Sequence, residues 1–460
     1  MEVHIMVVQH NMQAANANRM LNVTTSAQSK STEKLSSGYK INRAADDAAG
    51  LSISEKMRKQ IKGLDKASSN AQDGVSAVQT AEGALTEVHS MLQRMNELAT
   101  QAANGTNSES DRSSIQDEID QLTTEIDRVS ETTKFNETYL LKGQSGTTNK
   151  YMAAHDAGFD GTLVDGDTKA TFTMKIKAGE SLKIGGTNYD IYATGSGVSD
   201  LQDKVGKLTA NQEVTIDGTK YTVVDKADVD EKANKLEATT IAAKIQAGST
   251  VNLTPADASK AVKAVDTSKP TSIDVATATQ KVTAELQAAN DIGAADGKST
   301  VTAGTATADG TIEFAIQKGH ASVANTLSFN LHVGADADST NKITVNIDSM
   351  STAGLGIKGL NVKDSTGTAA TYAIDAIADA ISTVSSQRSS LGAVQNRLEH
   401  TINNLDNVSE NTTSAESRIR DTDMAKEMVN YSKNNILAQA GQSMLAQANQ
   451  SNQGVLSLLQ

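Results

Sequence analysis

The sequence predicts a mainly α rod of long, antiparallel, coiled-coil-like helices from both ends of the chain, with a β-rich α+β insert in the middle. The first observation is that apolar residues near both ends recur at alternating spacings of three and four, which places them on a narrow seam of a long helix. The second observation is that this period changes to two in the middle of the chain, as strands require. Because one helix cannot bury such a seam alone, we expect helices from the two ends to cover each other.

Three helices are predicted in the first part of the chain. A weakly amphipathic helix extends to about Tyr39. Its pattern is broken near this end by Ser36-Ser37-Gly38. Asp46 or Asp47 can cap the next helix, because a carboxylate accepts hydrogen bonds from free first-turn amides. That helix is expected to end near Ala103, before a turn at Asn104–Asn107, and a third helix ends before Lys134. The seams of the second and third helices are formed by Leu85, Val88, Leu92, Met95, Ala99 and Ala102, and by Ile115, Ile119, Leu122, Ile126 and Val129.

The last part of the chain predicts two more helices. One begins near Thr371 and is expected to end around Asn411-Thr412-Thr413, and the other covers Asp423 to about Asn449. The first of them has a seam interrupted by Arg388 and Gln395. Its apolar members are Ile374, Ile377, Ile381, Val384, Leu391, Leu398, Ile402 and Leu405.

The middle of the chain predicts strands. Residues 143–149 are expected to be a linker of turn residues, and residues 182–191 and 214–223 each predict a hairpin. Gly-Gly and Asp-Gly pairs supply the positive φ angles of their two-residue turns. The hairpins resemble each other position by position, and helical stretches at 198–208 and 228–246 suggest a duplicated ββα unit. Residues 251–310 are not assigned, and later strands are expected at 311–316, 327–333 and 343–347.

Composition narrows the class of protein. The 460 residues carry a formal net charge of −13, which argues against a nucleic-acid partner because phosphate binding needs clustered Lys and Arg. The absence of Cys excludes disulfides and thiolate metal sites. Aromatic residues are 3%, which favours thin helix packing over a large aromatic core. No secretory leader or membrane span is predicted, and residues 1–5 are interpreted as an extension before Met6.

The two ends of the chain predict a surface for self-assembly. Apolar stripes on short terminal helices bury too little to fold alone, and exposed apolar patches usually mark interaction sites. The alternative is a terminal helix docked on its own domain. We call the predicted surface the assembly set: Val8, Met12, Leu35, Met424, Met428, Val429, Ile436, Met444, Val455 and Leu459.

Long motifs at both ends resemble bacterial flagellin, the subunit of the flagellar filament. The N-terminal motifs are Leu35–Asn42, Asp46–Leu51, Asn70–Gly74 and Glu97–Asn104, and the C-terminal motifs are Ser417–Ala425 and Ile436–Gly441. The resemblance implies a filament-core helix at 1–45, rod helices at 46–142, a variable outward-facing insert at 143–326, a rod hairpin and helix at 327–421, and a second core helix at 422–460.

This resemblance also implies function and partners. The chain is expected to be secreted, to form a homopolymer for swimming motility, and to need no cofactor. Implied partners are the filament cap, junction proteins and an export chaperone on the C-terminal helix. Two alternatives are a hook–filament junction protein and an adhesin that acts through the insert; filament formation by the purified chain and deletion of residues 143–326 would distinguish them.

A further implied partner is Toll-like receptor 5 of a host. The residues carried over form the receptor set: Gln93, Arg94, Glu97, Leu98 and Glu118. Arg94 and Leu98 are four apart and share a helix face off the seam, which predicts an exposed leucine beside an arginine, a composition typical of binding hot spots. Asn96 stands where relatives often carry a second Arg. The alternative is a solvated helix face.

Catalytic patterns are weak. The seven histidines have no metal-ligand spacing, and His155-Asp156 is expected to be a surface loop. There is no His-Glu-x-x-His, Gly-x-Ser-x-Gly, Walker or Rossmann pattern. We therefore predict neither an enzyme nor a metal site.

Overall fold

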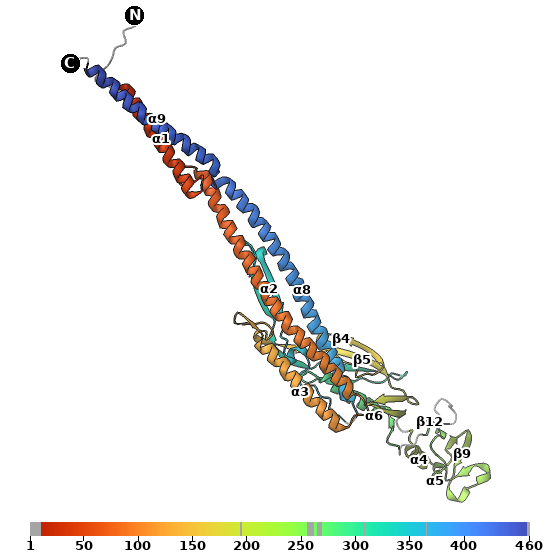
Figure 1. Cartoon of the computed structure of the whole chain (residues 1–460). Helices are drawn as coiled ribbons and strands as arrows, with labels where there is room; N and C mark the ends of the chain where they lie inside the picture. The colour runs from red at the N-terminus through yellow and green to blue at the C-terminus, as the bar shows by residue number, and fades with distance from the viewer. Residues whose placement is uncertain are drawn as a thin grey trace. The chain divides into compact units, whose positions relative to one another are not determined.

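The structure is a computed structural model that describes residues 11–193, 196–254, 262–264, 269–307, 309–364 and 366–457, with side chains up to Ser451. Its contacts divide the chain into two compact units. The terminal unit comprises Met1–Val75, Asn330–Thr344 and Gln395–Gln460, and the central unit comprises Ser76–Phe329 and Val345–Val394. Both units contain parts of α2 (Ala48–Ala102) and α8 (Thr368–Arg420), the longest helices of the described chain (Figure 1).

In the terminal unit, α1 (Met12–Ser37) and α9 (Met424–Ser457) lie side by side and antiparallel (Figure 1). The Asn11 side chain accepts from the Ala14 amide as the N-cap of α1 and donates to the Ala448 carbonyl near the end of α9. At the other end of the pair, Tyr39 forms a β-bridge with Asp421. Gly38 ends α1 with a φ of +76°, a left-handed conformation that glycine adopts without a Cβ penalty.

The terminal unit also pairs α2 with α8. Leu64 and Ala67 of α2 pack with Leu405 of α8 in one small apolar cluster. Polar bonds run beside it: the Ser68 hydroxyl donates to Asp406 at 2.9 Å and the Ser54 hydroxyl to Glu416 at 3.0 Å. The predicted pairing of helices from the two ends of the chain is therefore confirmed.

A glycine on α2 allows a hairpin to pack closely against the helix. The strands β17 (Leu327–His332) and β18 (Lys342–Ile347) pair in a two-stranded sheet, with the 3-10 turn η4 (Ser339–Asn341) before β18. A Cβ at Gly74 would lie 2.3 Å from Leu331 Cδ1. The hairpin can pack here only because position 74 has no side chain.

In the central unit, α3 (Glu109–Thr132) joins the remaining parts of α2 and α8. A reciprocal capping box between Ser108 and Asp111 starts α3. Residues at intervals of seven on α8 are buried through both units, as the heptad predicts. They are Ile377, Val384, Leu391, Leu398 and Leu405. On α2 the predicted seam is fully buried: Leu85, Val88, Leu92, Met95, Ala99 and Ala102.

The rest of the central unit is built from small sheets. A four-stranded sheet has the order β14 (Thr300–Ala303), β15 (Thr311–Gln317), β5 (Lys169–Lys175), β4 (Gly161–Asp165). A three-stranded sheet has the order β13 (Ser272–Asp274), β7 (Thr187–Tyr192), β6 (Ser181–Ile184). Both share one core with α6 (Val275–Asn290), centred on Phe172 and Phe314.

A five-stranded sheet has its own core with α4 (Val198–Gly206) and α5 (Ala238–Ala242). Its order is β10 (Lys235–Leu236), β9 (Thr219–Val223), β8 (Glu213–Ile216), β11 (Thr250–Asn252), β12 (Val262–Lys263). The smaller elements are β1 (Lys134–Phe135) with β2 (Thr138–Tyr139), β3 (Gln144–Tyr151) with β16 (His320–Asn325), and α7 (Thr352–Leu355).

Several predicted elements need correction. The expected linker at 143–149 is largely strand β3, because β16 supplies it with a pairing partner. The helix expected to end near Asn411 continues to Arg420. Residues 228–246 hold β10, α5 and the 3-10 turns η1 (Lys226–Asp228) and η2 (Glu231–Ala233) instead of one helix. His155 lies in a loop as expected, but its side chain is not on the surface. The side chain is 16% exposed, and its Nε2 lies 3.7 Å from Asp379 Oδ2.

No helix among the described residues is long and apolar enough to cross a membrane. Over the same residues, no group of three or more His, Asp and Glu side chains could hold a metal ion.

Candidate functional site

The assembly set lies on the α1–α9 pair wherever the structure describes it. Met12 of α1 and five residues of α9 are exposed: Met424, Met428, Val429, Ile436 and Met444. Leu35 is half-buried. Val8 and Leu459 lie outside the described residues, as does the side chain of Val455 on α9. The expected terminal stripe is thus largely open to solvent in a single copy of the chain.

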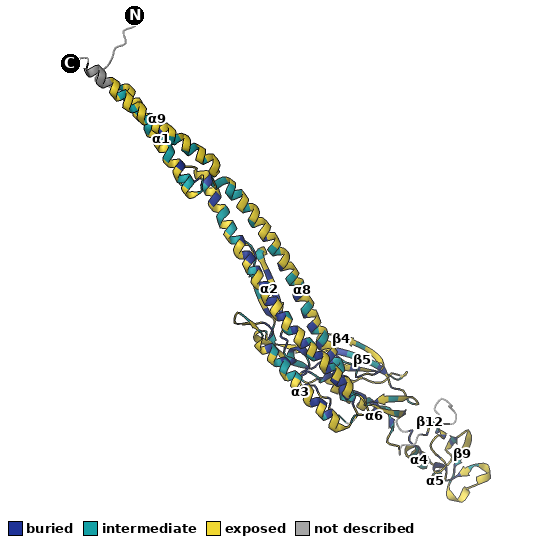
Figure 2. Ribbon diagram, viewed as in Figure 1, coloured by how far each residue is buried: buried dark blue, intermediate teal, exposed yellow. Residues whose placement is uncertain are grey.

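The exposure of large apolar side chains is concentrated on these two helices. Figure 2 shows α1 and α9 mostly as exposed or intermediate. Of the fourteen large hydrophobic residues exposed in the described chain, nine lie on α1 or α9. Three of the nine, Met20, Val23 and Leu437, were not predicted from the sequence, because they fall beside the expected stripes. Such a concentration is typical of an interaction surface.

Small residues hold α1 against α9. Ala438 is buried between the helices, and a Cβ added at Gly441 would meet Leu21 Cδ1 at 3.4 Å. Beside this contact lies a groove of 750 Å³, with Met20 and Leu21 on one helix and Leu437 and Met444 on the other. The pair therefore buries small side chains and leaves its large ones at the surface.

A polar cluster fixes the start of this pair. The Lys40 amide donates to the Arg420 carbonyl at 2.6 Å, and the Arg420 guanidinium lies 4.8 Å from the centroid of the Tyr39 ring. Arg420 also forms a 2.6 Å ion pair with Glu55. This bond to Arg420 is the main reason that the pKa of the Glu55 carboxyl is lowered.

The receptor set forms a charged bridge between α2 and α3. Arg94 Nε lies 2.9 Å from Glu118 Oε1, and Arg94 NH1 lies 3.2 Å from Glu97 Oε2. These carboxylates, Glu118 first, raise the pKa of Arg94. Gln93 hydrogen-bonds to His89 at 3.1 Å. Four of the five members, Gln93, Arg94, Glu97 and Glu118, are exposed, and the ion pairs bring Arg94, Glu97 and Glu118 together.

Leu98 does not belong to that face as expected. Its exposed fraction is 2%, so the predicted exposed leucine is wrong. In this part of the chain α2 is paired with α3 through Arg94 and Glu118 and with α8 through Glu82 and Arg388. Asn96 is half-buried, and its Oδ1 has no hydrogen-bond partner among the described residues.

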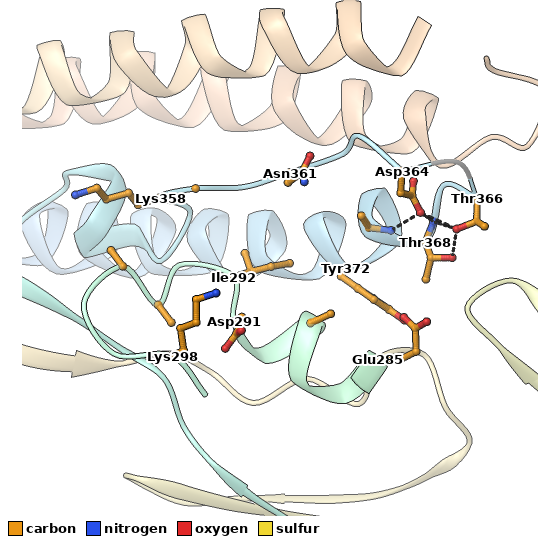
Figure 3. A pocket seen from close by; sticks show the side chains of 15 residues that line it. Glu285, Asp291, Ile292, Lys298, Lys358, Asn361, Asp364, Thr366, Thr368 and Tyr372 are labelled. Carbon is orange, nitrogen blue, oxygen red and sulfur yellow. Dashed lines mark hydrogen bonds between the residues drawn. The ribbon is translucent and has the colours of Figure 1, made fainter. Parts of the chain in front are cut away.

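The central unit contains a pocket of 620 Å³ beside the start of α8 (Figure 3). The Tyr372 hydroxyl donates to Glu285 at 2.8 Å, and burial, followed by the Glu285 carboxylate, raises the pKa of Tyr372. Asp364 accepts from the amides of Gly367, Thr368 and Ala369. These groups are engaged in hydrogen bonds that fix the start of α8.

Comparisons with known proteins assign the helical regions at both ends of the chain to one family. Family models for the bacterial flagellin N-terminal and C-terminal helical regions match residues 8–146 and 374–459. A flagellin of Clostridium tyrobutyricum is 43% identical over 97% of this chain and 100% of its own length. Flagellins of Bacillus subtilis and Halalkalibacterium halodurans are 37% and 34% identical, each over 99% of this chain and 100% of their own length. The chain therefore belongs to the bacterial flagellins, the non-enzymatic structural subunits that polymerise into the extracellular flagellar filament.

Proposed function

We propose that the assembly set is the surface through which subunits of this flagellin join. The observation that supports it is the concentration of exposed Met, Val, Ile and Leu side chains on α1 and α9. Burying such a side chain stabilises a contact by about 1.5–3 kcal/mol, so a few of them from each copy suffice to drive association. Polar substitutions in this set are therefore expected to block polymerisation and leave the subunit folded.

Ile436→Asp tests this proposal. The side chain is 66% exposed on α9, so its change leaves the helix pair intact but places a charge in the proposed contact. We expect the purified variant to remain in the supernatant after ultracentrifugation under conditions where the unmodified chain sediments as filaments. Asn188→Asp, which also adds a charge at an exposed position but lies on β7 outside the assembly set, is the control and is expected to sediment. Sedimentation of Ile436→Asp to the normal extent contradicts the proposal.

We propose in addition that the exposed bridge of Arg94, Glu97 and Glu118, with Gln93 next to it in the sequence, binds Toll-like receptor 5. The resemblance of these positions to the family's receptor site supports this, as does their placement on one accessible face. The bridge holds the Arg94 guanidinium in place, which lowers the entropy lost when a partner carboxylate binds it. Leu98 is left out of the contact because it is buried.

Arg94→Ala tests the receptor proposal. Loss of an arginine at the centre of an interface costs about 1–3 kcal/mol, so we expect receptor activation by the purified subunit to need roughly 5- to 150-fold more protein. Arg128→Ala is the control, because Arg128 is equally exposed and pairs with Glu125 on α3 alone. An unchanged dose response for Arg94→Ala contradicts the proposed site.

The remaining partners follow from family membership as proposals. We propose that the filament cap and junction proteins contact the same terminal helices, and that an export chaperone covers α9 before secretion. We propose also that residues 143–326 are the variable insert and face outward from the filament, with rod segments at 46–142 and 327–421 and core helices at 1–45 and 422–460.

A further inference from the structure

The two hairpins of the insert have the same pattern of backbone hydrogen bonds, as well as the same sequence pattern. The Gly179 amide donates to the Ile191 carbonyl at 2.8 Å, and the Ile191 amide donates to Glu180 at 2.9 Å. Thirty-two residues later, the Asn211 amide donates to the Val223 carbonyl at 2.8 Å, and the Val223 amide donates to Gln212 at 2.8 Å. Gly179 and Asn211 both have positive φ, at +90° and +71°. The hairpins β6–β7 and β8–β9 are therefore the same structure.

A third strand adds to each hairpin in the same way. β13 is parallel to β7, with Ile273 opposite Ile191. β10 is parallel to β9, with Leu236 opposite Val223. Each third strand is preceded by an equivalent bond, from the Asp190 amide to Thr271 at 2.9 Å and from the Thr222 amide to Asn234 at 3.0 Å. The predicted ββα repeat is thus a ββ–β–α repeat, and α4 is not the helix of the first copy.

A helix follows each third strand at once, and a lysine at the same offset from its start makes the same contact in both copies. α6 begins at Val275 and α5 at Ala238. Counted from these residues, the seventh position is Lys281 in one copy and Lys244 in the other. Lys281 Nζ lies 5.1 Å from the centroid of the Tyr189 ring, and Lys244 Nζ lies 5.9 Å from that of Tyr221. A repeated cation–π pair at equivalent positions is not expected from hairpin geometry alone.

The two copies bury equivalent residues in separate cores. Ile184, Ile191, Ile273 and Val282 are buried in the core shared with α6. Their counterparts Ile216, Val223, Leu236 and Ile245 are buried in the core shared with α4 and α5. Since no residue belongs to both cores, each copy has its own hydrophobic basis for folding.

The second copy lies within the segment that connects β7 to β13 of the first copy. The host copy (β6, β7, β13 and α6) leaves its hairpin at Tyr192 and returns at Ser272, and the whole inner copy (β8, β9, β10 and α5) lies between these residues. The inner copy makes the same crossover with residues 225–234 alone. We infer that β8, β9, β10 and α5 are a nested duplicate of the host unit, that the segment 193–271 that contains them is a separately folding cassette, and that neither the host fold nor filament assembly requires it.

Two substitutions at equivalent positions test the independence of the copies. Ile216→Asp places a charge in the inner core, and Ile184→Asp places one at the matching position of the host core. Hydrogen exchange measured by mass spectrometry on the full chain reports each copy separately. We expect Ile216→Asp to speed exchange about tenfold or more in residues 213–224 and 235–252 and to change residues 181–192 and 272–290 by less than about twofold. Ile184→Asp is expected to give the reverse pattern; loss of protection in both copies from either substitution overturns the inference.

A chain without the cassette gives the second test. Residues 193–271 are replaced by the sequence of residues 225–234, which is the connection that the duplicate itself uses. We expect residues 181–192 and 272–290 to keep their exchange protection within about twofold and the chain to sediment as filaments. Loss of protection in the host strands, or failure to polymerise, overturns the inference. The exchange readout stays informative even if the proposed assembly set is wrong, because it does not depend on filaments.

Discussion

Arg112 shows what single residues do in the central unit and what the sequence does not reveal about them. Its side chain is 2% exposed, and it donates to the carbonyls of Ala102, Asn104 and Asp364. Gln116, one helical turn later, donates to Leu360 and accepts from Val362. Both side chains fix the segment before α8 against α3. Nothing in the local sequence separates Arg112 from the exposed arginines, because the segment it binds lies about 250 positions later.

Asp364 gives a prediction about pH at the residue scale. Burial tends to raise the pKa of its carboxyl, but the hydrogen bonds from Thr366 and from the first amides of α8 lower it overall. Since the folded pKa lies below the ordinary value of 3.8, the ionised carboxylate stabilises the fold above that pH, and the stabilisation is lost as pH falls through the folded pKa. We expect Asp364→Asn to lower the melting temperature at pH 7 and to flatten its fall between about pH 5 and 2. Thermal unfolding followed by circular dichroism measures this; Asp167→Asn, an exposed control, is expected to follow the unmodified chain. If the melting temperature of Asp364→Asn falls between about pH 5 and 2 as steeply as that of the unmodified chain, the Asp364 carboxylate does not stabilise the start of α8 as proposed.

At the scale of elements, the sequence predicted the long helices well because their seams repeat many times. The hairpins 182–191 and 214–223 were also predicted, since Gly-Gly and Asp-Gly turns have local causes. Strand β3 was not, because residues 144–151 have no apolar alternation and are strand only through pairing with β16, far along the chain. Helix α6 was missed for a related reason: Ala and Thr fill its sequence, and its buried face becomes evident only beside two sheets. For the candidate site, both terminal stripes were predicted, whereas the burial of Leu98 was not, because its spacing from Arg94 says nothing about what covers it.

Two positions of the α8 seam make a prediction at this scale. Leu398 is fully buried, whereas Ile402, one turn later, is only half-buried although both fit the sequence pattern. We expect Leu398→Ala to lower the free energy of unfolding by about 2–5 kcal/mol and Ile402→Ala by roughly 1 kcal/mol. Urea denaturation of the monomer measures both changes. Equal losses for the two variants would contradict the structural distinction between a heptad core position and its flank.

At the scale of the whole molecule, the central unit and the terminal helices differ in where they place large apolar side chains. The central unit buries Phe159, Phe172 and Phe314 in one core, whereas α1 and α9 carry most of the large exposed hydrophobic side chains. A net charge of −13 makes separate copies repel one another, and in the assembly that we propose, apolar contact between terminal helices opposes that repulsion. Solubility before assembly and cohesion afterwards therefore reside in different residues of one sequence.

The antiparallel course of α1 and α9 has a practical consequence. Since Asn11 contacts Ala448, the beginning of one helix and the far part of the other meet at the same place. A label attached near Asn11 or near Ala448 would thus occupy the same region of the helix pair. The crossover between Tyr192 and Ser272 already contains the inner copy, so the host copy tolerates a long insertion there. A label for this polymer is therefore better inserted in that crossover.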